Sequence, residues 1–480
     1  MSRLFLAISD VHAEGTVPFG VTIVFSALLV GLILCLALEE KIHAKKSIIA
    51  GIFALLCLFL ANVFQLYEYV DHKFLIRLLP FDSAQGHTIA LPVYIPAIDW
   101  EVIGLIFGAS LFIDITSKSG LFTWIAIKLT KASRGDPRRL LWFYGLMTVV
   151  FSAVLNNVTA MIIVGSLTSV SLKKLGRVNL MLGFLLIEGL LTNIGGLLTL
   201  ISSVPNIIVG NAAGIGFMTF FVKAAPFVLV ATIGTILLGA KVFRIKSLRS
   251  MEERREAELL VSGFDENDGI EHGGFFWFGA TMLVLFIFTI ATTSVLPVIQ
   301  DLGMSFVALA FAAVMLVRYK ASVDKFYRAM DWDLLGFFAA LFVVINVMEH
   351  AMVLDLIGQG LSRVIHLNET VGHGAGTGAI LVSSALFSSV TDNIPLSAML
   401  AKILQAQGTV STDPLWWSVV FGANLGGNLT PIGSASTLVA VTIMHKNNLT
   451  MSFARFVKLA IPFATLHIVL ATVYVLLFLQ

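Results

Sequence analysis

Four short blocks of this sequence occur twice, in the same order and about half a chain length apart. The paired blocks are residues 99–104 and 331–336, 155–159 and 391–395, 192–196 and 423–427, and 226–227 and 462–463. Four blocks at a nearly constant spacing predict a duplicated structural unit. In membrane proteins, such a duplication is typical of transporters whose substrate site lies between the two copies.

The composition indicates that the duplicated unit lies in a lipid bilayer. Hydrophobic residues make up 58% of the chain and charged residues 12%, whereas a soluble domain carries about 25% charged residues. Apolar stretches long enough to cross a bilayer occupy residues 16–38, 47–68, 217–241, 275–296 and 454–480. No basic stripe with interleaved aromatic residues predicts nucleic-acid binding. The two cysteines, Cys35 and Cys57, cannot build a disulfide framework or a thiolate metal site.

Charged residues in the loops predict the orientation, because lysine and arginine accumulate on the cytoplasmic side. Lys41, Lys45 and Lys46 follow the first apolar stretch, so the N-terminus is predicted outside and the 67–98 loop outside as well. The linker 244–274 is rich in arginine and glutamate, and we expect it in the cytoplasm at the boundary between the repeats. The expected location is the cell (inner) membrane.

Each repeat contains an apolar segment that is interrupted by polar residues in its middle. Residues 140–172 are interrupted only around Asn156-Asn157, and basic residues flank both ends. This pattern favours a re-entrant hairpin over two short spans joined outside. The matching hairpin at 375–407 has its tip at residues 391–393 and mainly acidic flanks. Opposite flanking charge predicts inverted-topology repeats.

The predicted fold is therefore an all-α polytopic membrane protein with about 10 full spans plus two hairpins. Each repeat contains a re-entrant hairpin and a broken transmembrane helix. The expected divisions are residues 1–98 (N-terminal spans and external loop), 99–243 (transport core of repeat 1), 244–274 (charged linker), 275–330 (scaffold spans of repeat 2) and 331–480 (transport core of repeat 2).

The two hairpin tips (156–159 and 392–395) and two helix breaks (193–203 and 424–436) predict the transport site. Backbone that leaves a helix at membrane depth needs partners from protein, water or a ligand. The candidate residues are Asn156, Asn157, Thr159, Glu188, Asn193, Gly195, Gly196, Thr199, Ser203, Asn206, Asp392, Asn393, Pro395, Asn424, Gly426, Gly427, Asn428, Thr430, Ser434 and Ser436. The alternative for the glycines is helix packing, and for the asparagines a contact between helices.

Two acidic residues stand inside apolar segments. A carboxylate at the bilayer centre costs about 2.5–3.5 kcal/mol on insertion scales, so it needs a partner or a function. Asp392 is a candidate cation ligand and proton carrier, and the alternative is a helix cap. Glu188 either pairs with a buried donor or belongs to the ion site. Sodium is expected at Asp392, Asn393 and Asn424. His350, His366 and His373 fit a solvated loop better than a pH sensor.

The motifs resemble those of the ion transporter superfamily, in the branch of arsenite permeases, NhaD-type sodium/proton antiporters and the melanosomal P protein, which carries a citrate transporter-like domain. The resemblance covers residues 100–475 and rests on residues 156–159, 188–206, 391–395 and 426–436. It implies an elevator-like movement of the hairpin domain. Asn156 and Ser203 stand where relatives often have aspartate, so a symmetric pair of cation sites is in doubt.

The expected function is a non-enzymatic one, secondary active transport, with sodium (cation)/proton antiport as the leading hypothesis. Asp392 would bind and exchange both ion and proton. The alternative is a sodium- or proton-coupled carrier or efflux permease for a small anion or oxyacid such as arsenite or a carboxylate. No cofactor is expected apart from the coupling ion, sodium or a proton. The expected partners are the lipid bilayer and the transported ion, with a homodimer left open as the assembly.

Overall fold

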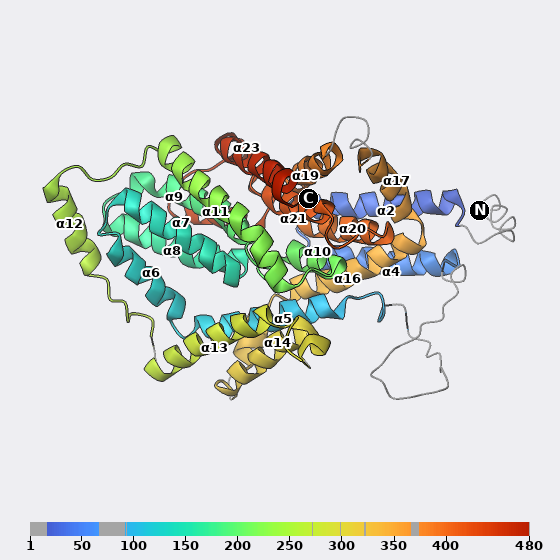
Figure 1. Ribbon diagram of the computed structural model, residues 1–480, viewed down its shortest axis with the longest axis horizontal. Coiled ribbons are helices and arrows are strands. Elements are labelled where there is room, and N and C mark those ends of the chain that lie inside the picture. The colour runs from blue at the N-terminus through green and yellow to red at the C-terminus, as the bar shows by residue number, and fades with distance from the viewer. Residues whose placement is uncertain are drawn as a thin grey trace. The chain divides into compact units, whose positions relative to one another are not determined.

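The computed structural model describes residues 17–66, 92, 94–270, 272–297, 299–320, 323–365 and 374–479, and it is helical with no strand in this part of the chain. The described chain divides into two compact units, whose helices are labelled in Figure 1. The first holds the described residues up to Ile103 together with 331–362. The second holds those of 104–330 and 363–480. Residues 1–16, most of the 67–98 loop, His366 and His373 lie outside the described residues.

Nine helices of the described residues are long and apolar enough to cross a membrane, which confirms the all-α membrane fold. They are α2 (Phe19–Ala37), α4 (Lys46–Val63), α5 (Trp100–Ser117), η1 with α9 (Val178–Gly195), α11 (Phe217–Val242), α13 (Gly273–Ala291), α14 (Ile299–Val317), α16 (Trp332–His350) and α23 (Phe453–Phe478). The broken helix predicted for the second repeat is present as α21 (Pro414–Gly426) and α22 (Ala435–Lys446), which are not among these nine helices.

The first unit is built on α2, α4 and α16, with the short α3 (Glu39–Ile42) and α17 (Val353–Ile365). A Cβ atom on Gly336 of α16 would lie 3.4 Å from Ser47 Cβ of α4. The Ser47 hydroxyl donates to Asp333 Oδ1 at 2.5 Å. A helix of the second repeat is thus joined to one of the first.

The same arrangement occurs in the second unit with the repeats exchanged. A Cβ atom on Gly104 of α5 would lie 3.2 Å from Ser305 Cβ of α14. Gly104 is the counterpart of Gly336 in the repeated block. On the same interface, the ring of Phe112 packs 4.4 Å from that of Phe286 in α13. Each repeat therefore contributes one helix to the scaffold of the other, so the two halves are interleaved as predicted.

The described part of the second unit contains eight further helices. They are α6 (Leu121–Ala132), α7 (Pro137–Val154), α8 (Asn157–Lys174), α10 (Val204–Ala213), α12 (Met251–Ser262), α15 (Asp324–Ala329), α19 (Ala375–Ser388) and α20 (Asn393–Ala406). Helices α7–α8 and α19–α20 form the two predicted hairpins, and each turns at the predicted tip. Helices α11 and α23 each have 26 residues with an internal proline, Pro226 or Pro462.

The polar residues at the tips start the second arm of each hairpin. Asn156 accepts a hydrogen bond from the backbone N–H of Thr159 at 2.8 Å, and α8 begins at the next residue. Asp392 accepts from the N–H of Ile394 at 3.1 Å, and α20 begins directly after it. Both residue types satisfy N–H groups that the first turn of a helix leaves free. The cap predicted as an alternative for Asp392 is therefore present.

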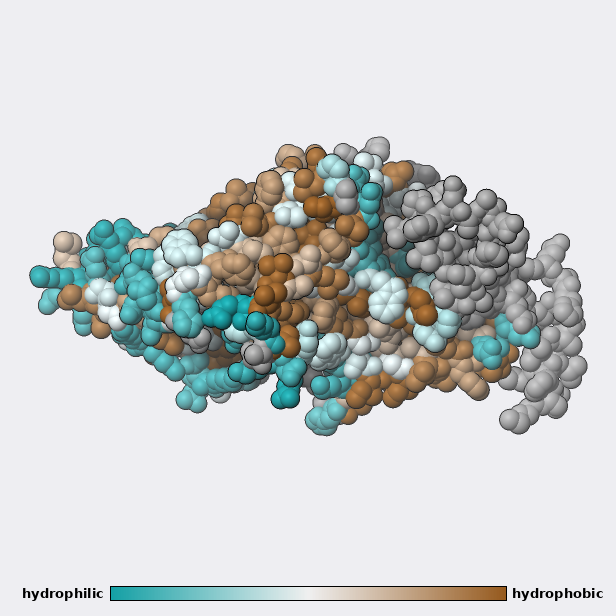
Figure 2. All heavy atoms as spheres, turned by 90° about the horizontal axis from the view of Figure 1, so that it is seen from below, coloured by the Kyte–Doolittle hydropathy of each residue, from teal (hydrophilic) through white to brown (hydrophobic). Residues whose placement is uncertain are grey.

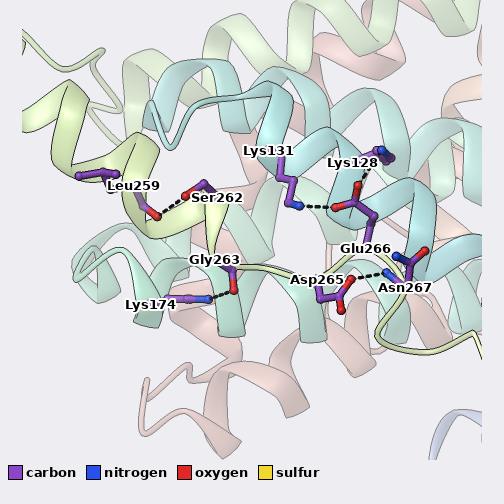
Figure 3. A network of polar contacts seen from close by, with 9 residues as sticks. All are labelled: Lys128, Lys131, Lys174, Leu259, Ser262, Gly263, Asp265, Glu266 and Asn267. Atoms are coloured by element: carbon purple, nitrogen blue, oxygen red, sulfur yellow. Dashed lines mark hydrogen bonds and ion pairs between the residues drawn. The ribbon is translucent and has the colours of Figure 1, made fainter.

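The charged linker contains α12 and packs on the ends of α6 and α8. Hydrophilic residues gather at this end of the second unit (Figure 2). Glu266 forms ion pairs with Lys128 and Lys131 of α6, the first at 2.8 Å, and Lys174 of α8 donates to Gly263 O at 3.1 Å (Figure 3). The linker is thus tied to two helices of the first repeat. The five divisions of the chain that were predicted from the sequence remain a prediction. The two compact units are defined by spatial contacts, whereas those divisions follow the repeats along the chain.

Candidate transport site

The two helix breaks meet in the second unit through a pair of equivalent hydrogen bonds. The Asn193 side-chain amide of α9 donates to Ser434 Oγ, just before α22, at 3.0 Å. The Ser203 hydroxyl, just before α10, donates to Asn424 Oδ1 of α21 at 2.7 Å. Asn193 and Asn424 occupy matching positions in the two repeats, as do Ser203 and Ser434. Each break is therefore completed by the other repeat.

The side-chain amide of Asn193 forms more hydrogen bonds than that of Asn424. Its Nδ2 also donates to Asn428 Oδ1 at 2.8 Å. Its Oδ1 accepts from Ser436 Oγ at 3.1 Å and from Asn157 Nδ2 at 3.3 Å. One buried amide thus holds a hairpin tip of repeat 1 and the break of repeat 2. Because an amide has two donors and one oxygen with two lone pairs, this side chain is saturated.

The side-chain amide of Asn424 donates hydrogen bonds to two oxygen atoms. Its Nδ2 donates to Asn206 Oδ1 at 2.9 Å and to the backbone oxygen of Val420 at 2.8 Å. Asn206 in turn donates to the backbone oxygens of Gly196 and Thr199, at 2.7 and 2.9 Å. These bonds satisfy carbonyl groups that the break after α9 leaves free. The asparagines therefore act here as the predicted contacts between helices.

Each break is also tied to the first arm of its own hairpin. Ser152 Oγ donates to Thr192 O at 2.6 Å, and Thr199 Oγ1 donates to Ala153 O at 2.6 Å. In the second repeat, the matching bonds run from Ser388 Oγ to Ala423 O and from Thr430 Oγ1 to Ser389 O, both at 2.5 Å. The hairpin and the broken helix of a repeat therefore form one hydrogen-bonded body.

The paired glycines lie in two kinds of surroundings. A Cβ atom on Gly195 would lie 2.6 Å from Val149 O, and one on Gly426 would lie 2.2 Å from Ala385 O. These two glycines let a broken helix pack closely on a hairpin arm. A Cβ atom on Gly196 would lie 2.7 Å from Asn157 Oδ1, and one on Gly427 would lie 2.9 Å from Gly433 O. These two face the polar loops.

The three residues predicted to share a sodium ion have different surroundings. Asp392 and Asn393 are partly exposed at the tip before α20. Asn424 is 2% exposed, and its amide is engaged as described above. Thr159 and Pro395 lie in the first turns of α8 and α20, and Asn156 is exposed. A shared ion stays a prediction, and among the described residues no group of three or more His, Cys, Asp or Glu is placed to hold a metal.

Glu188 lies in α9 and is fully buried. Its Oε1 accepts a hydrogen bond from Thr168 Oγ1 of α8 at 2.6 Å. Its Oε2 is buried and has no hydrogen-bond partner among the described residues. The predicted buried donor is therefore present, but it serves one of the two carboxyl oxygens.

His467 of α23 is a member of this polar group that the sequence analysis did not select. It is fully buried, with Nε2 2.7 Å from Thr235 Oγ1 of α11 and Nδ1 3.2 Å from Asn428 Nδ2. A histidine inside a predicted span was the available signal, because ionisable residues at membrane depth are rare and functional. The chain from Asn193 through Asn428 to His467 extends the site to the α11–α23 interface.

Comparisons with known proteins agree with this architecture. The chain is 29% identical over 387 residues to a 46 kDa membrane protein of Mycobacterium leprae, which covers 78% of this chain and 86% of that protein. It is 25% identical to the human P protein, over 92% of this chain and 60% of that protein, in line with the resemblance seen in the motifs. The crystal structure of the Alcanivorax borkumensis YdaH transporter is similar with a TM-score of 0.59 at 13% identity, covering 90% of this chain and 98% of that one.

The interleaved repeats, the paired hairpins and the joined helix breaks are thus features of a transporter rather than an enzyme. The profile of the citrate transporter family, CitMHS, matches residues 33–422, which is most of the chain. The protein is therefore a membrane transporter that belongs to the citrate transporter (CitMHS) family of the ion transporter superfamily.

Proposed function

We propose that this transporter is a secondary active cation/proton antiporter, with sodium as the expected cation and an elevator-like movement of the hairpin domain. The observation that carries the proposal is the site at the joined helix breaks, where amides and hydroxyls of both repeats converge. The second break is hydrogen-bonded through Thr430 to Ser389 of the hairpin whose tip carries the carboxylate of Asp392. Hard cations prefer oxygen ligands of this kind.

The charge of the site favours a cation over an anion of several charges. No lysine, arginine or histidine occurs within residues 156–159, 193–203, 392–395 or 424–436. Asp392 is the one acidic residue of these four segments and contributes a negative charge to them. A partly exposed carboxylate suits an ion that must exchange its water ligands on binding and release.

The proposed orientation follows the loop charges. The N-terminus lies outside and the linker 244–274 lies in the cytoplasm of a cell whose inner membrane holds the protein. The ion pairs of Lys128 and Lys131 with Glu266 place basic residues at the linker end of the second unit, which supports this orientation.

A carrier or efflux permease for a small anion is the second candidate, and the family's description as citrate transporters favours it. Four half-helices begin at the tips and breaks, at Asn157, Val204, Asn393 and Ala435. The N-terminus of a helix attracts anions through its free N–H groups. No side-chain cap occupies the N-terminus of α10, which begins at Val204. A carboxylate or arsenite with sodium as a counter-ion would use these N–H groups.

Proteoliposomes separate the two candidates. For the antiporter, an external sodium pulse drives protons out of acid-loaded vesicles, and Asp392→Asn abolishes this release. Asparagine caps a helix about as well as aspartate, so this variant removes the charge and keeps the fold. Proton release at the wild-type rate by Asp392→Asn would contradict the proposed mechanism. Sodium-dependent uptake of labelled citrate or arsenite without proton movement would support the second candidate instead.

A further inference from the structure

The protonation state of Glu188 poses a physical problem. The side chain is fully buried in α9, and Oε2 lacks a hydrogen-bond partner among the described residues. An ionised carboxylate with one unpaired oxygen is very costly in such surroundings. The protonated acid carries no charge, so its burial costs far less. The geometry therefore favours a carboxyl group that holds a proton.

The charges around Glu188 do not offset an ionised form. Tyr144 of α7 is the titratable side chain that interacts electrostatically with it. None of the ion pairs between described residues includes Glu188. The charged or titratable residues of the other packed helices stand near helix ends: Arg138, Arg139, Lys173, Lys174, Lys223, Lys241, His445 and Lys446.

A row of buried hydroxyl groups, hydrogen-bonded in two sets, lies between Glu188 and the linker. Thr168, which donates to Glu188, lies three residues before Ser171 on α8, so the two share one face of that helix. Ser171 Oγ lies 2.8 Å from the Tyr144 hydroxyl, and Tyr144 lies 2.6 Å from Thr130 Oγ1 of α6. All four hydroxyl-bearing residues are fully buried.

The far end of this row lies beside the linker. Thr130 is in the last turn of α6, and the loop that follows it contains Asp136. The Asp136 carboxylate accepts a hydrogen bond from the backbone N–H of Leu248 in the linker at 2.8 Å. A Cβ atom on Gly135 would lie 2.8 Å from Ala257 of α12. The hydroxyl row therefore connects the buried acid with the end of the unit that carries the linker.

Glu188 and Asp392 differ in their exposure to solvent and ions. Asp392 is partly exposed at a hairpin tip, where a hydrated cation can exchange its ligands. Glu188 is fully buried, and its hydrogen-bond partner is the Thr168 hydroxyl, a group that can relay a proton. The matching position of the second repeat is Val419, so the acid has no symmetric partner. Its role belongs to one repeat alone.

We propose that Glu188 carries the exchanged proton, that Asp392 binds the cation, and that the row Thr168–Ser171–Tyr144–Thr130 is the proton's route to the linker side. This inference rests on the proposed antiport, and it separates two roles that the sequence assigned to Asp392 together. The carboxyl O–H bond breaks, and the proton passes to a hydroxyl oxygen whose own proton moves on. Water at the linker face takes up the last proton, and Glu188 regains a proton from the opposite face after the elevator-like movement, so that one proton crosses the membrane in each cycle.

Counterflow of labelled sodium tests this division of roles, because sodium/sodium exchange needs no proton. In full-length protein in proteoliposomes, Glu188→Gln slows sodium-driven proton release by about a hundredfold or more and slows counterflow far less. Thr168→Val also slows proton release, whereas Thr168→Ser, which keeps the hydroxyl, restores it. Asp392→Asn loses both activities. Wild-type proton release by Glu188→Gln, or loss of counterflow together with proton release, would overturn the proposal.

Infrared spectroscopy tests the same inference without transport. The carbonyl stretch of a protonated carboxylic acid is expected in the wild-type protein and is removed by Glu188→Gln. Absence of that band from the wild-type spectrum would overturn the assignment of the proton to Glu188. If the wild-type protein exchanged no protons for sodium, the antiport proposal would fail, whereas the band would still report the protonation of Glu188. The two failures are therefore distinguishable.

Discussion

The side-chain amide of Asn193 lies 3.0 Å from the hydroxyl of Ser434 and so joins the broken helix of one repeat to that of the other. The matching bond between Ser203 and Asn424 joins the same two broken helices, with the repeats exchanged. With the serine and threonine bonds to the hairpins, both breaks and both first arms form a continuous hydrogen-bonded body. Such a body can move as one piece, as the proposed elevator mechanism requires.

Asn193→Ala is expected to destabilise the protein strongly. The substitution leaves Asn428 Oδ1 without its donor and removes the acceptor of Ser436 Oγ, and both residues are buried. An unsatisfied buried polar group costs about 1–3 kcal/mol, so the free energy of unfolding falls by at least that amount. Thermal melting in detergent measures the change, with the exposed Asn62→Ala of α4 as control. Equal melting temperatures for the two variants would contradict this account.

Alanine at Gly195 or Gly426 is expected to separate a broken helix from its hairpin. The added Cβ would lie 2.6 Å from Val149 O or 2.2 Å from Ala385 O, and these backbone atoms cannot move aside cheaply. Overpacking of this kind costs about 1–3 kcal/mol. Gly51→Ala in α4 is the matched control, because a Cβ there meets nothing within 4 Å. Melting temperatures should fall for the first two variants and hold or rise for the control.

The sequence predicted the architecture well because its strongest signals were local and repeated. Polar interruptions in apolar segments marked the hairpin tips at Asn156 and Asp392 and the breaks after Gly195 and Gly426, since backbone in a bilayer leaves the helix only where partners exist. Capping residues, and a proline in the first turn of α7, α10 and α21, then set where these helices begin. The repetition supplied the correspondence between the halves, and the loop charges supplied their opposite orientation.

The partners of each polar residue could not be predicted in the same way. The contacts of Asn193 with Asn428 and Ser436 join residues that are far apart in the chain, and no local pattern encodes them. The sequence around Thr168 and Ser171 gives no sign of their role. Their role becomes visible only in the structure, where Thr168 contacts Glu188 of α9 and Ser171 contacts Tyr144 of α7. His467 has no counterpart in the first repeat, where Ala231 stands, so the repetition that revealed the other residues gave no signal for it.

The contact between His467 and Thr235 is expected to show energetic coupling. Asn428 Nδ2 donates, so Nδ1 of His467 accepts and Nε2 carries the hydrogen that Thr235 Oγ1 receives. The Thr235 hydroxyl in turn donates to Ala231 O at 2.6 Å. In a double-mutant cycle, His467→Leu and Thr235→Val should show a coupling free energy of about 0.5–3 kcal/mol. Additive losses would argue against the contact, and His467→Gln, which keeps a donor and an acceptor, should lose less than His467→Leu.

Docking of the linker on α6 is expected to depend on pH through Glu266. Hydrogen bonds from Lys128 and Lys131 lower the pKa of this carboxyl from 4.5 to about 2. Because the pKa is lower in the docked state, the ion pairs contribute fully above the ordinary carboxyl pKa. Their contribution is lost as the pH falls from 4.5 toward 2. Glu266→Gln should release the linker already at neutral pH.

A spin label at Asp268→Cys, in protein with Cys35 and Cys57 replaced, reports this release as increased mobility. The label should be immobilised at pH 6 in the parent and should become mobile below about pH 4, where protonation of the carboxyl begins to weaken the ion pairs. Glu253→Gln on the exposed face of α12 removes one charge without touching α6 and should leave the label immobilised. High salt should mimic Glu266→Gln in part, because the pairs are partly exposed and screened. A label that stays immobilised in Glu266→Gln would show that Lys174 and the Asp136 contact hold the linker without the ion pairs.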